Sequence, residues 1–275
     1  MPRAERARHA VHRARQTFRT FDHPVRLLAG AAAGKARGTA PDLVFRIGDV
    51  GVTAPASEGA IFPIYEVFAE DVYRLGWFTR DLGDGPGVLD IGAHVGSFSL
   101  AFLRLHRDAR IAAYEASPTT ASYLRRSVET SGAAGSVSCH AEAVSTVAGH
   151  IDFTDNDTCS PMNGLTARHG HTGQLTRVPS ITLATAFARL GRVDLVKIDA
   201  EGVEYDLVLT SDPGLWSQVS RAVLEYHQVE GNSRDQLVDF FAATGLREVA
   251  HEPMLGNPLE GLSWFAREPF ADTGP

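Results

Sequence analysis

The sequence predicts an α/β protein built on a doubly wound, mostly parallel β-sheet. Between residues 87 and 244, short apolar runs alternate with segments of helical periodicity, which is typical of parallel strands joined by helical crossovers. The first apolar run, 88–91, leads into a glycine-rich turn and then into helical spacing, as in the first strand, loop and helix of a nucleotide-binding unit. The residues before 87 are expected to form a helix and hairpin extension.

Composition and charge limit the classes of function. The chain has 275 residues, of which 44% are hydrophobic, so it can bury the core of one large domain with an extension. Its net charge of -7 argues against nucleic-acid binding. Cys139 and Cys159 form no C-x-x-C pair, which argues against disulfides and structural zinc and favours a reducing cytoplasm. No apolar run approaches the roughly 20 residues that span a bilayer, and the basic start lacks the apolar segment of a secretory signal.

Residues 1–40 are predicted to form a basic N-terminal arm and a linker. The first 21 residues are rich in arginine and alanine and have helical propensity, but they offer few apolar positions for packing. A solvated helical arm is therefore favoured over a helix that docks a partner or lies on a membrane surface. Residues 29–41 are small and glycine-rich, as in a linker. A homodimer formed through the arm stays an alternative, although no strong apolar stripe supports it.

Residues 41–80 are predicted to form a hairpin and a helix that cap the main domain. The apolar runs 43–47 and 50–52 flank Gly48 and Asp49, a typical hairpin turn. Residues 61–78 have mostly helical spacing, and Pro63 is expected in the first helical turn, where a missing N–H costs nothing.

The main domain is predicted over residues 81–270. Its expected strands are 87–91, 110–114, 137–141, 143–145, 150–153, 193–198, 221–226, 246–250 and 262–266. Its expected helices are 95–106, 119–131, 183–190 and 233–244. The polar segment 154–176 is predicted to be a long loop, and loops of this length are usually functional or disordered.

The glycine-rich turn favours a cationic ligand over a phosphate. Its pattern is Asp-x-Gly-x-x-x-Gly, with Asp90, Gly92 and Gly96, rather than the G-x-G-x-x-G that binds a pyrophosphate. The glycines permit positive φ and close approach of a ligand. The charge of Asp90 would repel a phosphate but attract the sulfonium and amino groups of S-adenosylmethionine.

Acidic residues follow the ends of the expected strands. In open α/β sheets, ligands bind beyond the carboxyl ends of the strands, so these acids are expected to face one crevice. Glu115 is placed to accept the hydroxyls of a ribose, and Glu142 to accept from an adenine amino group. Together they favour an adenosine ligand. The strand-end acids are Asp90, Glu115, Glu142, Asp199 and Glu225.

Lys197 is unusual because it interrupts a strand that otherwise appears buried. A buried lysine needs an acidic partner or a lowered pKa. We expect a structural ion pair with Glu201, Glu204 or another strand-end acid rather than a catalytic lysine. The loop residues Asp155, Asp157, His169 and His171 give only a weak indication of a metal site.

Several of these motifs resemble those of the FkbM-type S-adenosylmethionine-dependent methyltransferases. The matching runs are 88–96 (VLDIGAHVG), 114–118 (YEASP), 143–145 (AVS) with Gly149, 194–204 (DLVKIDAEGVE) and 224–227 (LEYH). Their order and spacing cover roughly residues 60–268. The resemblance implies a Rossmann-like seven-stranded sheet with an antiparallel last strand, and O-methylation of a hydroxyl on a secondary metabolite or sugar. His94 and Ala184 depart from the family, which more often has asparagine and aspartate there.

The resemblance also implies which residues hold the cofactor. The glycine-rich loop would bind the amino-acid part of S-adenosylmethionine, Glu115 the ribose, and Glu142 with Ala143 the adenine. Asp199 would stabilise the cationic cofactor by its charge. The full set of expected cofactor-binding residues is Asp90, Gly92, Ala93, His94, Gly96, Ser97, Glu115, Ala116, Ser117, Glu142, Ala143 and Asp199.

A hydroxyl acceptor must lose a proton during methyl transfer, so a base is expected. His227 is the preferred base because an unperturbed histidine titrates near neutral pH, and Glu225 or Glu201 would orient it. No metal is assigned. A Mg²⁺ site formed by Asp199, Glu225 and His227 stays an alternative.

Three other functions stay open. Transfer to nitrogen or to a carboxylate would make His227 dispensable. A dinucleotide-dependent oxidoreductase is disfavoured because G-x-G-x-x-G is missing. A non-catalytic protein on the same fold is disfavoured by the intact strand-end acids, although a fold does not determine a function.

Overall fold

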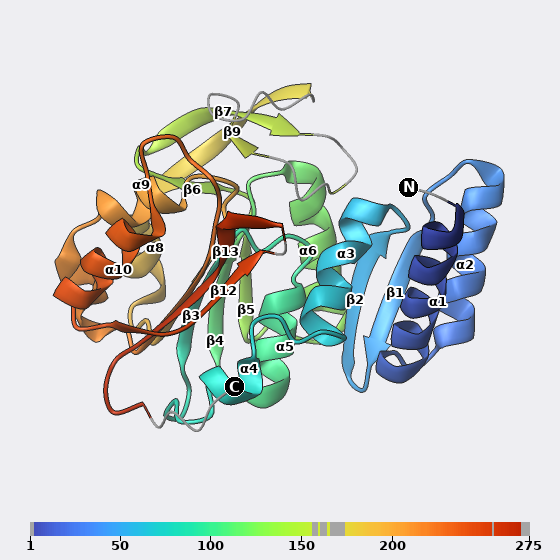
Figure 1. Ribbon diagram of the computed structural model, residues 1–275, viewed down its shortest axis with the longest axis horizontal. Coiled ribbons are helices and arrows are strands. Elements are labelled where there is room, and N and C mark those ends of the chain that lie inside the picture. Colours follow the sequence, from blue (N-terminus) through green and yellow to red (C-terminus); the bar gives the residue numbers. More distant parts are fainter. Residues whose placement is uncertain (1–2, 156–158, 160–163, 166–173, 255, 271–275) are drawn as a thin grey trace.

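A seven-stranded β-sheet forms the centre of the computed structural model, which describes residues 3–155, 159, 164–165, 174–254 and 256–270 (Figure 1). The strand order is β12-β13-β11-β10-β3-β4-β5. β13 runs antiparallel to both of its neighbours, and the remaining pairs are parallel, as predicted. The strands are β3 (Gly87–Ile91), β4 (Arg110–Tyr114), β5 (Val137–His140), β10 (Leu195–Ile198), β11 (Arg221–Tyr226), β12 (Arg247–Met254) and β13 (Asn257–Ala266).

Helices cover both faces of this sheet, which confirms the doubly wound architecture (Figure 1). Val88 packs into the hydrophobic cluster of α5 and α6, whereas Leu89 packs into that of α8, α9 and α10, because successive side chains of a strand point to opposite faces. The helices are α5 (Ser97–Leu105), α6 (Pro118–Thr130), α8 (Leu183–Leu190), α9 (Glu204–Leu209) and α10 (Arg234–Ala243).

Short polar side chains start two of these helices close to the predicted positions. The Ser117 hydroxyl accepts the N–H of Thr120 at the start of α6, and the Thr182 hydroxyl accepts that of Thr185 at the start of α8. Helix α9 and the 3₁₀ helix Pro213–Gln218 were not predicted, because six residues are too few for a clear periodicity.

A second, four-stranded sheet lies beside the main one. Its order is β6-β9-β7-β8, from β6 (Ala143–Ser145), β7 (Gly149–Asp155), β8 (Gly164–Leu165) and β9 (Gln174–Thr182). Parts of the predicted loop 154–176 are therefore strands, since β7 ends at Asp155 and β9 starts at Gln174. The predicted loop residues Asp157, His169 and His171 lie outside the described residues.

The predicted linker is a helix. α1 (Arg3–Thr20) and α2 (Pro24–Arg37) precede the hairpin of β1 (Asp42–Ile47) and β2 (Val50–Pro55) (Figure 1). The alanine-rich stretch continues α2 up to Gly38, whose left-handed φ of 65° ends the helix. This stretch is a helix rather than a linker because α2 packs against the hairpin and buries its Leu27 there.

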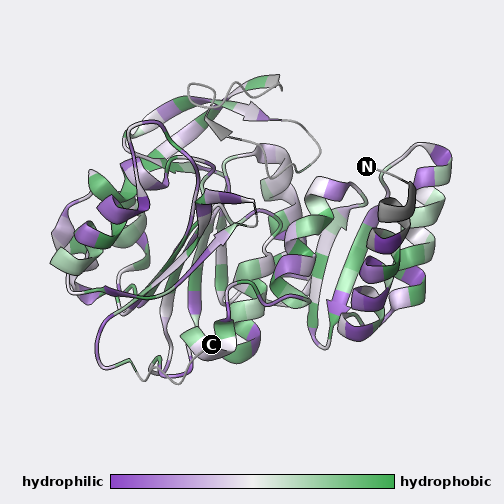
Figure 2. Ribbon diagram, in the orientation of Figure 1, coloured by the Kyte–Doolittle hydropathy of each residue, from purple (hydrophilic) through white to green (hydrophobic). Residues whose placement is uncertain are grey.

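The arm is not entirely solvated. Figure 2 shows α1 as mostly hydrophilic, in agreement with its sequence. Phe21, directly after α1, nevertheless belongs to the core, because it is buried against the rings of Phe45 and Tyr65. The buried Thr17 hydroxyl lies 2.7 Å from the Tyr65 hydroxyl.

The predicted helix 61–78 is divided in two. α3 (Glu58–Phe68) starts after Ser57, whose hydroxyl accepts the Ala60 N–H, and α4 (Leu75–Phe78) follows a break at Asp71 and Arg74, which both have positive φ. Pro63 lies inside α3 rather than in its first turn, because the cap at Ser57 starts the helix earlier than predicted.

The division into arm, cap and main domain stays a prediction. None of the described helices is both long and apolar enough to cross a membrane.

Candidate active site

A cavity of about 930 Å³, counting space open to solvent, lies at the carboxyl ends of β3, β4 and β10. This is the edge of the sheet at which the sequence places the site. The predicted residues that line the cavity are Gly92, Ala93, His94, Ser97, Glu115, Ala116, Glu142, Ala143, Asp199 and Glu201. The predicted residues that do not line it are Asp90, Gly96, Ser117, Glu225 and His227. Pro63 and Val67 of α3, together with Tyr73, add a wall that was not assigned to the site from sequence.

The glycine-rich loop is tightly packed against its neighbours. Gly92 has a φ of 73°, and a Cβ at this position would lie 1.7 Å from the carbonyl oxygen of Asp199. The N–H groups of Gly92 and Ala93 both donate to the carbonyl of Tyr114. Gly96 has a φ of 92° and precedes α5, where a Cβ would meet the Leu124 side chain. The prediction that these glycines take positive φ is confirmed.

Asp90 lies beneath the cavity rather than in its wall. It is fully buried, and its carboxylate accepts a hydrogen bond from the Ser99 hydroxyl at 2.6 Å. Its other oxygen lies 3.5 Å from the Lys197 ammonium, which also lies 3.3 Å from Asp199. The strand-end partners of Lys197 are therefore Asp90 and Asp199, not Glu201 or Glu204. Burial lowers the pKa of Lys197, but the two carboxylates outweigh it and raise the pKa above its ordinary value.

Glu115 lies in the cavity wall, where two backbone N–H groups hold its carboxylate. Its carboxylate accepts the backbone N–H of His94 and that of Ser117, each at 2.9 Å, and it lines the cavity. Burial raises its pKa to about 7, although the two N–H donors oppose this shift. Ser117 itself does not face the cavity, because it caps α6 and donates to Asp155.

Buried polar atoms of three cavity-lining residues lack a hydrogen-bond partner among the described residues. Besides the Tyr114 hydroxyl, they are Nδ1 of His94 and the hydroxyl oxygen of Ser97. The other ring nitrogen of His94 bonds the carbonyl of Cys159. Buried polar groups are normally satisfied, so these atoms are suited to a polar ligand. With Glu115, they fit the amino-acid and ribose parts of S-adenosylmethionine.

Glu142 lines the cavity and has a cationic partner. Its carboxylate pairs with Arg189, and the ring of His140 lies 3.8 Å away. Each carboxylate oxygen has two acceptor positions, so the pair with Arg189 leaves acceptor capacity for an amino group.

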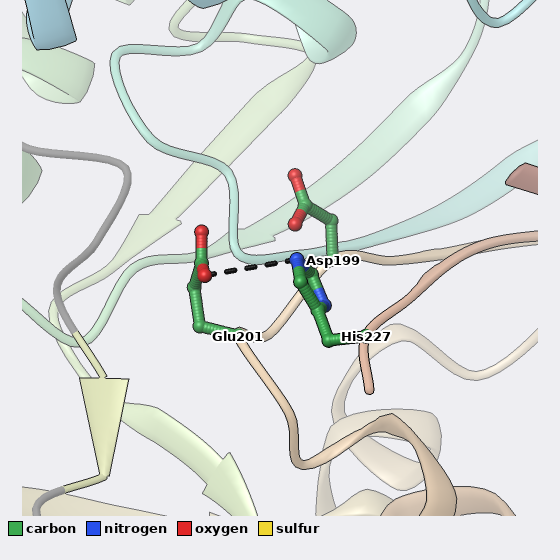
Figure 3. A group of neighbouring side chains, drawn as sticks. All are labelled: Asp199, Glu201 and His227. Carbon is green, nitrogen blue, oxygen red and sulfur yellow. Dashed lines mark ion pairs between the residues drawn. The ribbon is translucent and has the colours of Figure 1, made fainter. Parts of the chain in front are cut away.

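A second group of side chains lies where β10 and β11 end. Metal-binding atoms of Asp199, Glu201 and His227 all lie within 4.8 Å of one another (Figure 3). The Nε2 atom of His227 lies 3.6 Å from Glu201, and its Nδ1 atom lies 3.1 Å from Glu204. Glu204 is fully buried, and its carboxylate also accepts the N–H groups of Ala200 and Gly202. It thereby holds the turn that carries Glu201.

The charges in this group shift several pKa values. Burial and the nearby Asp199 raise the pKa of Glu201 to about 8 and that of Glu66 to about 7, and raise that of Glu225 well above its ordinary value. Burial lowers the pKa of His227, but its hydrogen bond to Glu204 and the charges of Glu204, Glu201 and Asp199 outweigh this and raise it to about 10. The premise that His227 titrates near neutral pH is therefore wrong.

Sequence reasoning missed two contributors to this group. Glu204 was considered only as a partner of Lys197, although it stands three residues after Glu201 in the 194–204 run. Glu66 lies on α3, far from the motif in sequence, and no local pattern marks it. Only the packing of α3 brings it near Asp199.

Comparison with known proteins identifies the family of the chain. Residues 90–248 match the profile described as the methyltransferase FkbM domain. The chain is 24% identical over 202 residues to the methyltransferase sdnD of Sordaria araneosa, which covers 62% of this chain and 76% of that protein. It is similar to the solved structure of M. jannaschii TYW2 in complex with AdoMet, with 14% identity, a TM-score of 0.44 and coverage of 84% and 88%. It is also similar to a SAM-dependent methyltransferase from Agrobacterium tumefaciens, with 12% identity, a TM-score of 0.45 and coverage of 82% and 70%.

Proposed function

Because the chain belongs to the FkbM methyltransferase family, we propose that it transfers a methyl group from S-adenosylmethionine to a hydroxyl oxygen of a small molecule. The acceptor class that we favour is a secondary metabolite or a sugar. The observation that supports a hydroxyl is the group formed by Asp199, Glu201 and His227 at the edge of the cavity. Carboxylates in this position can accept the proton that a hydroxyl must lose, whereas a carboxylate acceptor is already ionised and needs no such group.

The residues around the cavity divide between the parts of the cofactor. Glu115 would accept hydrogen bonds from the ribose hydroxyls, and Glu142 with Ala143 would lie beside the adenine. Ala93, Ser97 and His94 would surround the amino-acid part, and Ala116 would lie beside the ribose. Three predicted residues do not line the cavity but support the residues that do. They hold the glycine-rich loop and the starts of α5 and α6, and they are Asp90, Gly96 and Ser117.

The cofactor supplies a methyl group on a positively charged sulfur. Transfer forms an oxygen–carbon bond, breaks the carbon–sulfur bond and releases the hydroxyl proton. The cavity contributes mainly by holding the acceptor oxygen in line with the methyl group and by excluding water. Asp199, which lines the cavity, adds negative charge that favours a cationic ligand there.

The proton is received by the group at the end of β10. We place Glu201 nearest to the acceptor hydroxyl, because it lines the cavity whereas His227 does not, and its pKa of about 8 makes it an effective base as the pH rises toward that value. His227 lies behind Glu201, is held protonated at neutral pH, and orients the carboxylate rather than removing a proton. Glu225 adds negative charge beside Asp199.

Methyl transfer to hydroxylated acceptors tests this proposal. With methyl-labelled cofactor, we expect a labelled ether product, and Glu201→Gln should lower kcat by about 10²-fold while leaving the cofactor Kd unchanged. Glu129→Gln, which removes an exposed carboxylate on α6, should leave both parameters unchanged. Full turnover by Glu201→Gln, or a label found only on nitrogen or on a carboxylate, would contradict the proposal and favour the alternative acceptors.

A further inference from the structure

The group at the ends of β10 and β11 presents a mixed set of donors to one point. Asp199 and Glu201 each offer a carboxylate oxygen and His227 offers a ring nitrogen (Figure 3). These three atoms lie within 4.8 Å of one another, so small side-chain movements bring them to a common centre. Hard divalent cations such as Mg²⁺ and Mn²⁺ prefer carboxylate oxygens, and Mn²⁺ also accepts imidazole.

A fourth residue orients the imidazole from outside this group. Glu204 is fully buried and lies 3.1 Å from Nδ1 of His227. While Nδ1 donates its proton to this carboxylate, a bound cation would displace the proton of Nε2 and take the lone pair of that nitrogen. Nε2 is the atom that lies beside Glu201. A carboxylate bonded to the far nitrogen of a histidine is the arrangement usually found behind histidine ligands of metals.

The charges around the site favour a cation as well. Asp199, Glu201, Glu204 and Glu225 bring four carboxylates into the neighbourhood of His227. Lys197 pairs with Asp199 but also neutralises the buried Asp90, so it does not balance this excess. Buried charges are retained where they are paired or where they bind a metal.

From these observations we propose that Asp199, Glu201 and His227 bind one divalent cation at the edge of the cofactor cavity. Asp199 and Glu201 line the cavity, so a cation held by them would be accessible to a ligand in the cavity. A hydroxyl bound there would have a lowered pKa and would lose its proton more readily. This role in methyl transfer rests on the proposed function, whereas binding of the cation does not.

Binding of Mn²⁺ to the full chain, without cofactor or acceptor, tests the site directly. Titration followed by electron paramagnetic resonance should show one Mn²⁺ per chain, displaced by Mg²⁺. Glu201→Gln and His227→Gln, which remove ligands, should weaken binding by more than about tenfold. Glu204→Gln keeps the ligands but loses the orienting charge, and should weaken it by about tenfold. The control Glu129→Gln should bind as the unmodified chain does.

Calorimetry with S-adenosylmethionine on the same variants separates the two proposals. Glu201→Gln and His227→Gln should keep the cofactor affinity, which shows that the cavity is folded. If the unmodified chain shows no saturable Mn²⁺ binding, or if both ligand variants bind Mn²⁺ unchanged, the cation site is wrong. Mn²⁺ binding that needs Glu201 and His227 supports the site even if methyl transfer to hydroxyls is not observed, and then only the proposed function fails.

Discussion

The ammonium of Lys197 donates a hydrogen bond of 2.6 Å to the carbonyl oxygen of Gly92. A buried charge from β10 thus holds the glycine-rich loop that follows β3. The same ammonium lies beside Asp90 and Asp199, and it is 5.9 Å from the centre of the Tyr73 ring. One side chain therefore links the floor of the cavity, its glycine loop and its acidic edge.

Lys197→Met should destabilise the protein by about 3–5 kcal/mol, because it leaves the buried Asp90 carboxylate without its cation. Urea unfolding followed by circular dichroism measures the change in the free energy of unfolding. Lys35→Met is a matched control, since Lys35 is the only other lysine and is exposed on α2. The double variant Lys197→Met/Asp90→Asn should recover part of the loss. Equal free energies of unfolding for Lys197→Met and Lys35→Met would contradict the assigned role of Lys197.

Gly92→Ala should abolish binding of S-adenosylmethionine and destabilise the fold, because its Cβ would lie 1.7 Å from the carbonyl oxygen of Asp199. Gly132→Ala separates this clash from backbone strain. Gly132 has a similar φ of 62°, but a Cβ there meets nothing within 4 Å. Its substitution should cost about 1–2 kcal/mol and leave the cofactor affinity unchanged. Calorimetric titration of both variants is the measurement, and cofactor binding by Gly92→Ala would refute the prediction.

Cofactor affinity should fall as the pH drops through about 7, the value to which burial raises the pKa of Glu115. Below that pH the carboxyl group is protonated and accepts the ribose hydroxyls poorly. At pH 6 the Kd should be about tenfold higher than at pH 8, and Glu115→Gln should remove this dependence. Calorimetry across this range checks it, and an unchanged pH profile in the variant would show that another group titrates.

The raised pKa of Glu115 also predicts the sign of a stability effect. Its folded-state pKa of about 7 exceeds the ordinary value of 4.5, so its contribution to stability is present below about 4.5 and is lost as the pH rises to about 7. Thermal unfolding of the cofactor-free chain should show a smaller loss of Tm over this range in Glu115→Gln than in the unmodified chain.

Thr17→Val should cost about 1–2 kcal/mol, because it leaves the buried Tyr65 hydroxyl without its partner at 2.7 Å. The double variant Thr17→Val/Tyr65→Phe removes both hydroxyls and should be less destabilised than the sum of the single variants. Urea unfolding of the three variants gives the coupling energy. Additive effects would mean that α1 does not depend on this contact for its packing.

Local patterns were sufficient for most elements of the main domain. The alternation of apolar runs and helical spacing predicted β3, β4, β10 and β11 close to their observed bounds. Strand and helix periodicities depend only on residues that are near one another in the sequence. Predictions failed where packing decided the outcome. The small residues of α2 carry no strong periodicity, and they form a helix because α2 packs against the hairpin, with its Leu27 buried. α3 and α4 are separate because of the left-handed residues between them.

The sequence by itself determined the fold class, the two glycines of positive φ and the edge of the sheet where acidic side chains gather. These follow from residue type and order, because parallel strands present their carboxyl ends at one edge. Only the tertiary structure decided which of these groups touch. The register of β10 on β3 places Lys197 opposite Asp90, and the burial of Glu204 against His227 raises the pKa of the histidine. Such pairings depend on distances of a few ångströms between segments far apart in the chain, and no local pattern encodes them.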